Sequence, residues 1–146
     1  MTTIAGLALD DLLALRSLDR AGVAARFGGA RTTPDVRYEG IEGVDRLDPE
    51  DLPAHFFFLG DEQLMLYVPR RALADVGPEQ LRAELGPPAA SLRSRTGGDS
   101  QLLVWPDQGV AFATDGASVE ILEVFPPTTL EDYSEHIYQD PGEFFR

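Results

Sequence analysis

The spacing of apolar residues near the start of the chain is typical of short amphipathic helices. Leucines at helical intervals predict a helix over residues 9–18, and Val23 and Phe27, four apart, predict a second over residues 19–27. Gly28 follows at once and should end the second helix, because glycine adopts the left-handed C-cap conformation without strain. The chain therefore opens with two helices in succession.

Runs of apolar and aromatic residues then predict three extended segments. They cover residues 36–38 with Ile41, residues 55–59 and residues 64–68. Gly60 begins the turn that should join the last two segments as a hairpin. Pro69 ends the final strand, because proline cannot donate a hydrogen bond to a neighbouring strand. We expect residues 30–34 and 43–53 to form loops.

The rest of the chain repeats this order of elements. A short helix is predicted over residues 70–76, and another begins at Pro78 and ends at Gly86, which is the usual placement of proline and glycine. Strands follow over residues 102–105, 109–113 and 119–125. Asp115 and Gly116 supply the turn between the last two strands. Residues 89–100 are the segment that we expect to be mobile.

A shift of 58 positions lays the first half of the chain on the second. It brings Val23 onto Leu81, Phe27 onto Leu85 and Gly28 onto Gly86. We predict a single α+β domain over residues 1–146, built of two tandem ααβββ units. Residues 8–69 and 70–127 are the two pseudo-repeats, and their strands should form one antiparallel sheet backed by helices. A short C-terminal helix and tail occupy residues 128–146, with Thr128 as the cap and Glu131 reaching back to it.

The motifs of the second half resemble a known family. They are the helix exit at residues 85–88, the strand carrying Trp105 and Pro106, the strand over residues 109–112, and the last strand through Ile121 and Val124. This combination resembles the BamE (SmpA/OmlA) module, and its tandem form resembles the β-lactamase-inhibitor-protein fold, in which the sheet face away from the helices grips a partner protein. The chain lacks the signal peptide and lipidated cysteine of the BamE pattern, so no outer-membrane role is carried over. The resemblance implies an adaptor or inhibitor-like binding module.

Composition narrows the class of function. Twenty-five acidic residues against twelve basic ones give a net charge of −13. Contacts to phosphates need clustered cations, so this charge argues against binding of nucleic acid or an anionic membrane surface. The chain has no cysteine, which excludes disulfides and thiolate chemistry. The opening residues lack a basic signal-peptide region and no apolar run reaches the length of a membrane span, so we expect a cytoplasmic protein.

Residues that could carry catalytic chemistry are few and scattered. We expect His55 to be a partly buried structural histidine at the start of a strand and His136 to be a solvated helix residue, because the two do not form a metal-binding pair. No serine lies in a nucleophile elbow, and no glycine-rich loop has the spacing of a nucleotide-binding motif. We therefore predict no catalytic residue, no metal and no cofactor.

Apolar residues on both faces of the strands indicate that the side of the sheet away from the helices is also covered. The cover could be the terminal helix, the loops or another chain. Large apolar side chains at alternate positions are the candidate anchors for a partner protein, since such residues are enriched in interfaces. These candidates are Phe57, Met65, Tyr67 and Trp105.

Acidic residues concentrate in the last third of the chain. Ten occur from Asp99 to Glu143, and no arginine lies between Arg95 and Arg146. They could steer a basic partner towards this half, or they could only keep the protein dispersed. The candidate steering residues are Asp107, Asp115, Glu120 and Glu123. Glu120 and Glu123 are three apart and should point to opposite faces of an unbulged strand, which makes them poor catalytic partners.

These observations predict a non-catalytic protein-binding module of the inhibitor, immunity or adaptor type. The alternative is a small hydrolase or small-ligand-binding domain with a pocket near His55. A pocket in which His55 lies within hydrogen-bonding distance of a carboxylate would favour that alternative. A third possibility is a homodimer joined through the last strand or through residues 138–146, with Phe144 and Phe145 buried against the second copy.

Overall fold

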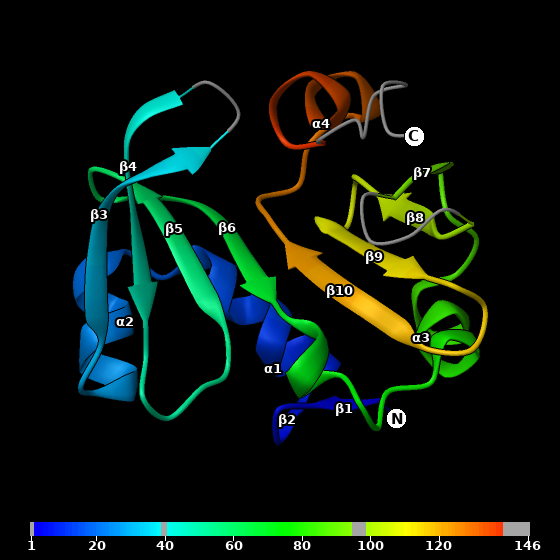
Figure 1. Ribbon diagram of the computed structural model, residues 1–146, viewed down its shortest axis with the longest axis horizontal. Coiled ribbons are helices and arrows are strands. Elements are labelled where there is room, and N and C mark those ends of the chain that lie inside the picture. Colours follow the sequence, from blue (N-terminus) through cyan, green and yellow to red (C-terminus); the bar gives the residue numbers. More distant parts are fainter. Residues whose placement is uncertain (1, 39–40, 95–98, 139–146) are drawn as a thin grey trace.

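One eight-stranded antiparallel sheet forms the centre of the protein (Figure 1). A computed structural model describes residues 2–38, 41–94 and 99–138. The strands are β1 Thr3–Ile4, β2 Leu7–Ala8, β3 Arg31–Tyr38, β4 Ile41–Asp48, β5 His55–Leu59, β6 Glu62–Val68, β7 Ala90–Arg93, β8 Gln101–Trp105, β9 Val110–Thr114 and β10 Val119–Val124. The helical segments are α1 Leu9–Ala14, η1 Leu15–Ser17, α2 Arg20–Phe27, η2 Arg70–Ala72, α3 Pro78–Leu85 and α4 Leu130–His136. The predicted α+β class is confirmed, and eight of these strands form one antiparallel sheet.

The sheet consists of two meanders that meet through their last strands. Its order is β3-β4-β5-β6-β10-β9-β8-β7, and β1 and β2 form a separate two-stranded sheet. The antiparallel junction pairs Val68 with Leu122 and Leu66 with Val124. Both junction strands lie in the middle of the sheet, so their backbone groups have neighbours on either side. Figure 1 shows the two meanders side by side, β3–β6 in cyan and green and β8–β10 in yellow and orange.

The second and third α-helices begin and end where the local sequence predicts. Asp19 caps α2 by accepting a hydrogen bond from the backbone N–H of Gly22 at 2.7 Å. Pro78 occupies the first turn of α3. Gly28 and Gly86 follow the two helices with φ angles of +50° and +84°, which side chains rarely tolerate. These signals act over a few residues, which is why they could be interpreted before the fold was known.

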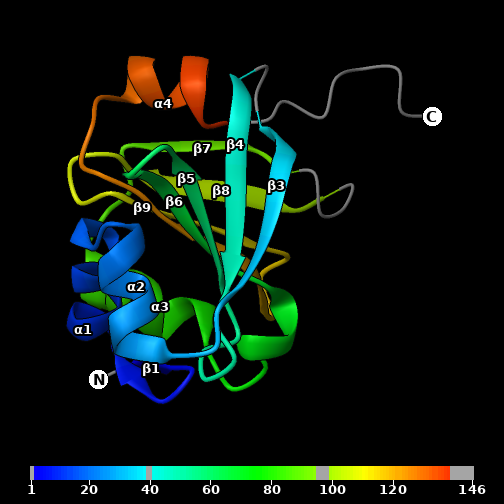
Figure 2. The same cartoon turned by 90° about the vertical axis from the view of Figure 1, so that its left-hand side faces the viewer.

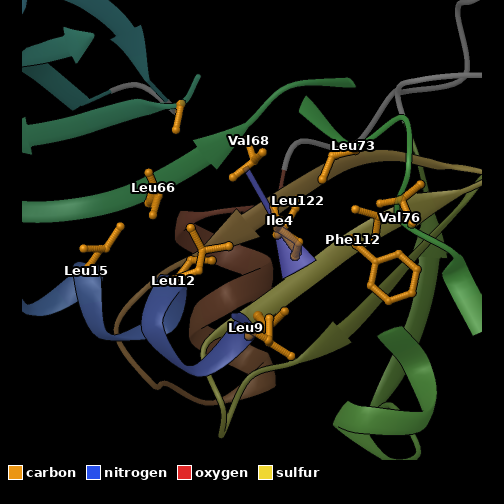
Figure 3. Close-up of a cluster of buried hydrophobic side chains, with 14 of the residues drawn as sticks. Ile4, Leu9, Leu12, Leu15, Leu66, Val68, Leu73, Val76, Phe112 and Leu122 are labelled. Atoms are coloured by element: carbon orange, nitrogen blue, oxygen red, sulfur yellow. The ribbon is translucent and has the colours of Figure 1, made fainter. Parts of the chain in front are cut away.

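Helices α1, α2 and α3 pack on one face of the sheet, the helix face, and α4 packs on part of the other. This helix face packs against α1, α2 and α3, and Figure 3 shows Leu9, Leu12 and Leu15 meeting Leu66, Leu122 and Phe112 there. We call the opposite side the second face. Its buried residues are Tyr38, Val44, Met65, Leu102, Val104, Ala111, Ala113, Phe125 and Tyr133. Figures 1 and 2 show α4, which carries Tyr133, at the opposite end of the molecule from α1, α2 and α3. The terminal helix is thus part of the cover that the sequence required.

Several sequence predictions were wrong about the extended segments. Residues 30–34 and 43–53 were expected to be loops, but they contribute to β3 and β4. Residues 90–93, expected to be mobile, form β7. Each meander therefore has four strands, one more than predicted.

Helix predictions needed smaller corrections. Of the predicted helix over residues 70–76, only Arg70–Ala72 is helical, as a short 3-10 turn. The terminal helix is capped by Thr129, which accepts from the backbone N–H of Asp132 at 3.1 Å, and not by Thr128. Among the described residues the longest helices, α2 and α3, have eight residues each, far fewer than the roughly 20 needed to cross a bilayer.

Candidate functional site

Three of the four predicted anchors lie together on the second face. Met65 is buried, and Phe57 and Tyr67 are half-buried beside it. Met65 is the direct cross-strand partner of Phe57. The ring of Phe57 packs against Tyr38 with centroids 5.4 Å apart. The structure therefore groups these side chains on the β5–β6 part of the second face, as the sequence predicted.

Trp105 does not belong to this group. It is 1% exposed and packs in the core cluster of the helix face. Its indole N–H donates to the backbone oxygen of Gly86 at 2.9 Å, and its ring stacks on Phe112 at a centroid distance of 5.4 Å. The prediction that Trp105 shares a face with Tyr67 was wrong, because the pairing of Trp105 with Val110 turns the indole towards α3.

A row of polar side chains crosses the second face from β3 to β10. Cross-strand partners share a face, so neighbouring strands align their side chains into rows. Arg31 is paired with Asp48, Asp48 contacts His55, His55 is paired with Tyr67, and Tyr67 with Glu123. The rings of His55 and Tyr67 stack with centroids 6.1 Å apart. Five strands thus place one ionisable or phenolic group each in a continuous line.

The centre of polar chemistry in this row is the Asp48–His55 pair. His55 Nδ1 lies 2.6 Å from Oδ1 of Asp48, and the other carboxylate oxygen faces Arg46 at 3.2 Å and Arg31 at 3.7 Å. An ionised carboxylate only accepts, so Nδ1 carries the proton and Nε2 of a neutral imidazole is left as the acceptor. Within the described part of the chain, His55 makes no hydrogen bond to a hydroxyl group. His55 is therefore an imidazole base oriented by Asp48, with no hydroxyl nucleophile bonded to it among the described residues.

A hollow of about 350 Å³ lies beside this pair. Arginines from β3, β4 and η2 line it together with the segment between β4 and β5; they are Arg31, Arg46 and Arg71. The condition stated for a pocket near His55, a carboxylate within hydrogen-bonding distance, is met by Asp48. The sequence did not reveal this carboxylate, because residues 43–53 were interpreted as a loop, and only the β4–β5 register places Asp48 opposite the start of β5.

The other end of the row is tied to the terminal helix. The Tyr133 hydroxyl donates to Oε1 of Glu123 at 2.6 Å, and both side chains are buried. Burial raises the pKa of Tyr133 well above its ordinary value, and the negative charge of Glu123 raises it further. Tyr133 also packs on Phe125, with ring centroids 5.1 Å apart. These contacts hold α4 on the second face.

The four predicted steering acids have different environments. Asp107 is exposed, as steering requires. Asp115 is exposed too, but its carboxylate accepts from the backbone N–H groups of Ser118 and Ala117, which lower its pKa. Glu123 is buried against Tyr133, and Glu120 is only 4% exposed, with Arg70 at 2.6 Å.

The steering prediction was therefore wrong for Glu120 and Glu123, because Glu123 is buried against Tyr133 of α4 and Glu120 is buried with its carboxylate on Arg70 of η2. A register shift between Val119 and Ile121 also shows that the strand is bulged, contrary to the regular alternation assumed for the two glutamates.

His136 lies at the end of α4 and is exposed, as predicted. Its ligand atoms and those of Asp132 and Glu135 come within 4.8 Å of one another, and all three residues are exposed. Such spacing follows directly from neighbouring turns of a helix. Exposed carboxylates in that arrangement do not define a metal centre without further ligands. Phe144 and Phe145, suggested for a homodimer contact, lie outside the described residues.

Comparison of the chain with models of protein families, with curated proteins and with solved structures finds no match.

Proposed function

We propose that the protein is a non-catalytic binding module that docks another protein on the β3–β6 part of its second face. The observation that carries the proposal is the group of Phe57, Met65 and Tyr67 on the second face, with Phe57 and Tyr67 left half-buried. The terminal helix adjoins this group and packs through Tyr133 on Phe125 and Glu123. Half-buried aromatic rings around a buried methionine offer apolar area at small cost in side-chain entropy. Leu59, on the adjoining strand end, is 40% exposed and extends this surface.

We further propose that the chain arose by duplication of one unit of two helical segments and a meander. Adding 58 to the bounds of α2, residues 20–27, produces 78–85, the bounds of α3. The same shift moves residues 31–38 of β3 onto 89–96, which include β7. Joining two such units through β6 and β10 makes one broad sheet, and a broad sheet offers a docking face larger than either unit alone. The proposal agrees with the resemblance to tandem inhibitor-type folds.

A basic protein fits the side of this face that adjoins α4. Exposed acids on α4, namely Glu131, Asp132 and Glu135, stand beside the second face and complement a cationic surface. Charges at the rim of an interface act mainly on the rate of encounter and are screened by salt. We therefore assign the apolar contacts to affinity and the acids of α4 to orientation.

The test compares capture of a partner from lysate of the source cells by the natural protein and by single variants. Phe57→Ala and Tyr67→Ala should each weaken retention about tenfold or more, because truncating a central aromatic anchor costs about 2 kcal/mol. Phe27→Ala is the matched control, since Phe27 is an equally half-buried aromatic residue that packs on Phe56 on the helix face. Thermal unfolding of each variant verifies that it is folded.

Capture should also fall as salt is raised from low to physiological ionic strength. The proposal fails if no protein is retained at low salt, or if Phe27→Ala reduces capture as much as Phe57→Ala does.

A further inference from the structure

The hollow beside Asp48 and His55 carries an inference that does not depend on protein docking. We propose that it is a binding site for a small organic carboxylate, with the carboxylate group held by Arg31, Arg46 and Arg71 and the apolar body against the segment between β4 and β5. Such a ligand is favoured by the shape of the hollow, its supply of hydrogen-bond donors and its apolar wall.

Shape is the first consideration. The hollow measures about 350 Å³, which falls within the range of roughly 300–1,000 Å³ typical of small-molecule sites. It is lined by residues 49–54, between β4 and β5, and by side chains of β3, β4, β5 and η2, so segments distant in the sequence converge on it. Arg31 and Arg46 stand on the paired strands β3 and β4, which hold side chains more rigidly than a loop does.

The donors around the hollow outnumber the acceptors that satisfy them. Asp48 is the one carboxylate shared by His55, Arg46 and Arg31, and its contact to Arg31 is long at 3.7 Å. Arg71 forms no ion pair with any residue that the structure describes. The Nε–H group of Arg46 is buried and has no acceptor among the described residues. A buried donor without a partner is destabilising until an acceptor reaches it.

The hollow is less negative than the protein as a whole. Three arginines and three acids line the hollow, so its formal charge is zero with neutral His55, whereas the whole chain has −13. The Asp48 carboxylate is already in contact with His55, Arg46 and Arg31. The Glu50 carboxylate lies against Gly29, just after the end of α2: a Cβ built on Gly29 would be only 2.7 Å from Oε2 of Glu50. Of the three acids that line the hollow, only Asp51 remains to compete with a ligand for the arginines. The guanidinium fork matches the planar geometry of a carboxylate.

The remaining wall selects an organic acid over an inorganic anion. Pro53 is the exposed apolar side chain of the lining, while Leu52 and Ala54, each 3% exposed, belong to the core behind it. An apolar ligand body can cover the Pro53 ring, while a hydrated phosphate ion cannot replace the water over it favourably. The ligand class is therefore a carboxylate attached to a small ring or short chain.

Titration with benzoate, followed by nuclear magnetic resonance of backbone amides and of the Arg46 Nε–H group, tests the proposal. Benzoate should produce saturable shifts at residues of the hollow with a dissociation constant of about 1 mM, as expected for so small a ligand. Benzyl alcohol, which has the ring without the charge, and inorganic phosphate, which has the charge without the ring, should each bind at least about tenfold more weakly.

Arg71→Gln should weaken benzoate binding about tenfold. Arg82→Gln is its control, because Arg82 is an exposed arginine of α3 that does not line the hollow. Both variants should melt like the natural protein, since neither arginine has an ion-pair partner among the described residues.

The proposal is overturned if benzoate causes no saturable shift up to about 10 mM. It is overturned equally if phosphate binds as tightly as benzoate, or if Arg82→Gln weakens binding as much as Arg71→Gln. None of these results bears on capture of a protein through Phe57 and Tyr67, so the two proposals fail separately.

Discussion

Replacing Trp105 with alanine is expected to lower the free energy of unfolding by about 3–5 kcal/mol. The indole is 1% exposed and stacks on Phe112, so its removal opens a large cavity in the helix face. The change also removes the N–H group that donates to Gly86, leaving a carbonyl at the end of α3 without this donor. A loss of this size is a large share of the roughly 5–15 kcal/mol by which domains are stable, so the urea midpoint of the variant should fall sharply.

Urea unfolding followed by circular dichroism measures this effect without relying on the fluorescence of the replaced tryptophan. Trp105→Phe separates the two contributions, because it keeps an aromatic ring but has no N–H group. We expect Trp105→Phe to lose about 1–2 kcal/mol and to remain folded. Equal unfolding midpoints for Trp105→Ala and the natural protein would mean that the indole is not packed as described.

Alkaline solution is expected to destabilise the protein through Tyr133. Burial and the nearby Glu123 raise the pKa of Tyr133 in the folded state above its ordinary value of 10.0. Above pH 10 the unfolded chain releases the phenolic proton while the folded protein retains it. The free energy of unfolding should therefore be unaffected by this group below pH 10 and should fall by about 1.4 kcal/mol for each pH unit above it.

Tyr133→Phe isolates this contribution. At neutral pH the variant should be less stable by about 1–3 kcal/mol, because the buried carboxylate of Glu123 loses a hydrogen-bond donor. Above pH 10 the variant lacks the titrating phenol, so its stability should fall less steeply and approach that of the natural protein. Urea unfolding at a series of pH values measures both curves. Parallel curves between about pH 9 and pH 11 would contradict the raised pKa.

The helices and hairpins could be predicted because their signals are local. Gly28 and Gly86 each end a helix within one residue of the position expected, and Pro78 begins α3. Asp115 orders its turn by accepting from backbone N–H groups two and three residues further along the chain. Interactions of this range require no knowledge of the rest of the fold.

The edge strands escaped prediction because they lack the pattern of a strand with neighbours on both sides. β3 contains Pro34 and then Asp35, whose φ of +52° coincides with a shift in the β3–β4 register. Proline is tolerated there because an edge strand has one side without a hydrogen-bonding neighbour. At the other edge, β7 has only four residues. Their sequences look like loops, and pairing with β4 and β8 makes them strands.

The candidate site depended on contacts between segments that the sequence does not link. The Asp48–His55 pair requires the β4–β5 register, and the Glu123–Tyr133 pair requires α4 to fold back over the sheet. The sequence identified Phe57, Met65 and Tyr67 as a group because residues two apart in a strand share a face. It could not say on which face Trp105 would lie, since that depends on another strand.

By itself the sequence determined the α+β class, the order of most helices and strands, and the need to cover both faces of the sheet. Those features follow from the period of apolar residues and from turn residues acting at short range. Only the tertiary structure decided which side chains meet: the indole of Trp105 under α3, the Glu123 carboxylate under Tyr133, and three arginines around one hollow. The physical reason is that strand register assigns each side chain to a face, and a shift of one residue would send all of them to the other side.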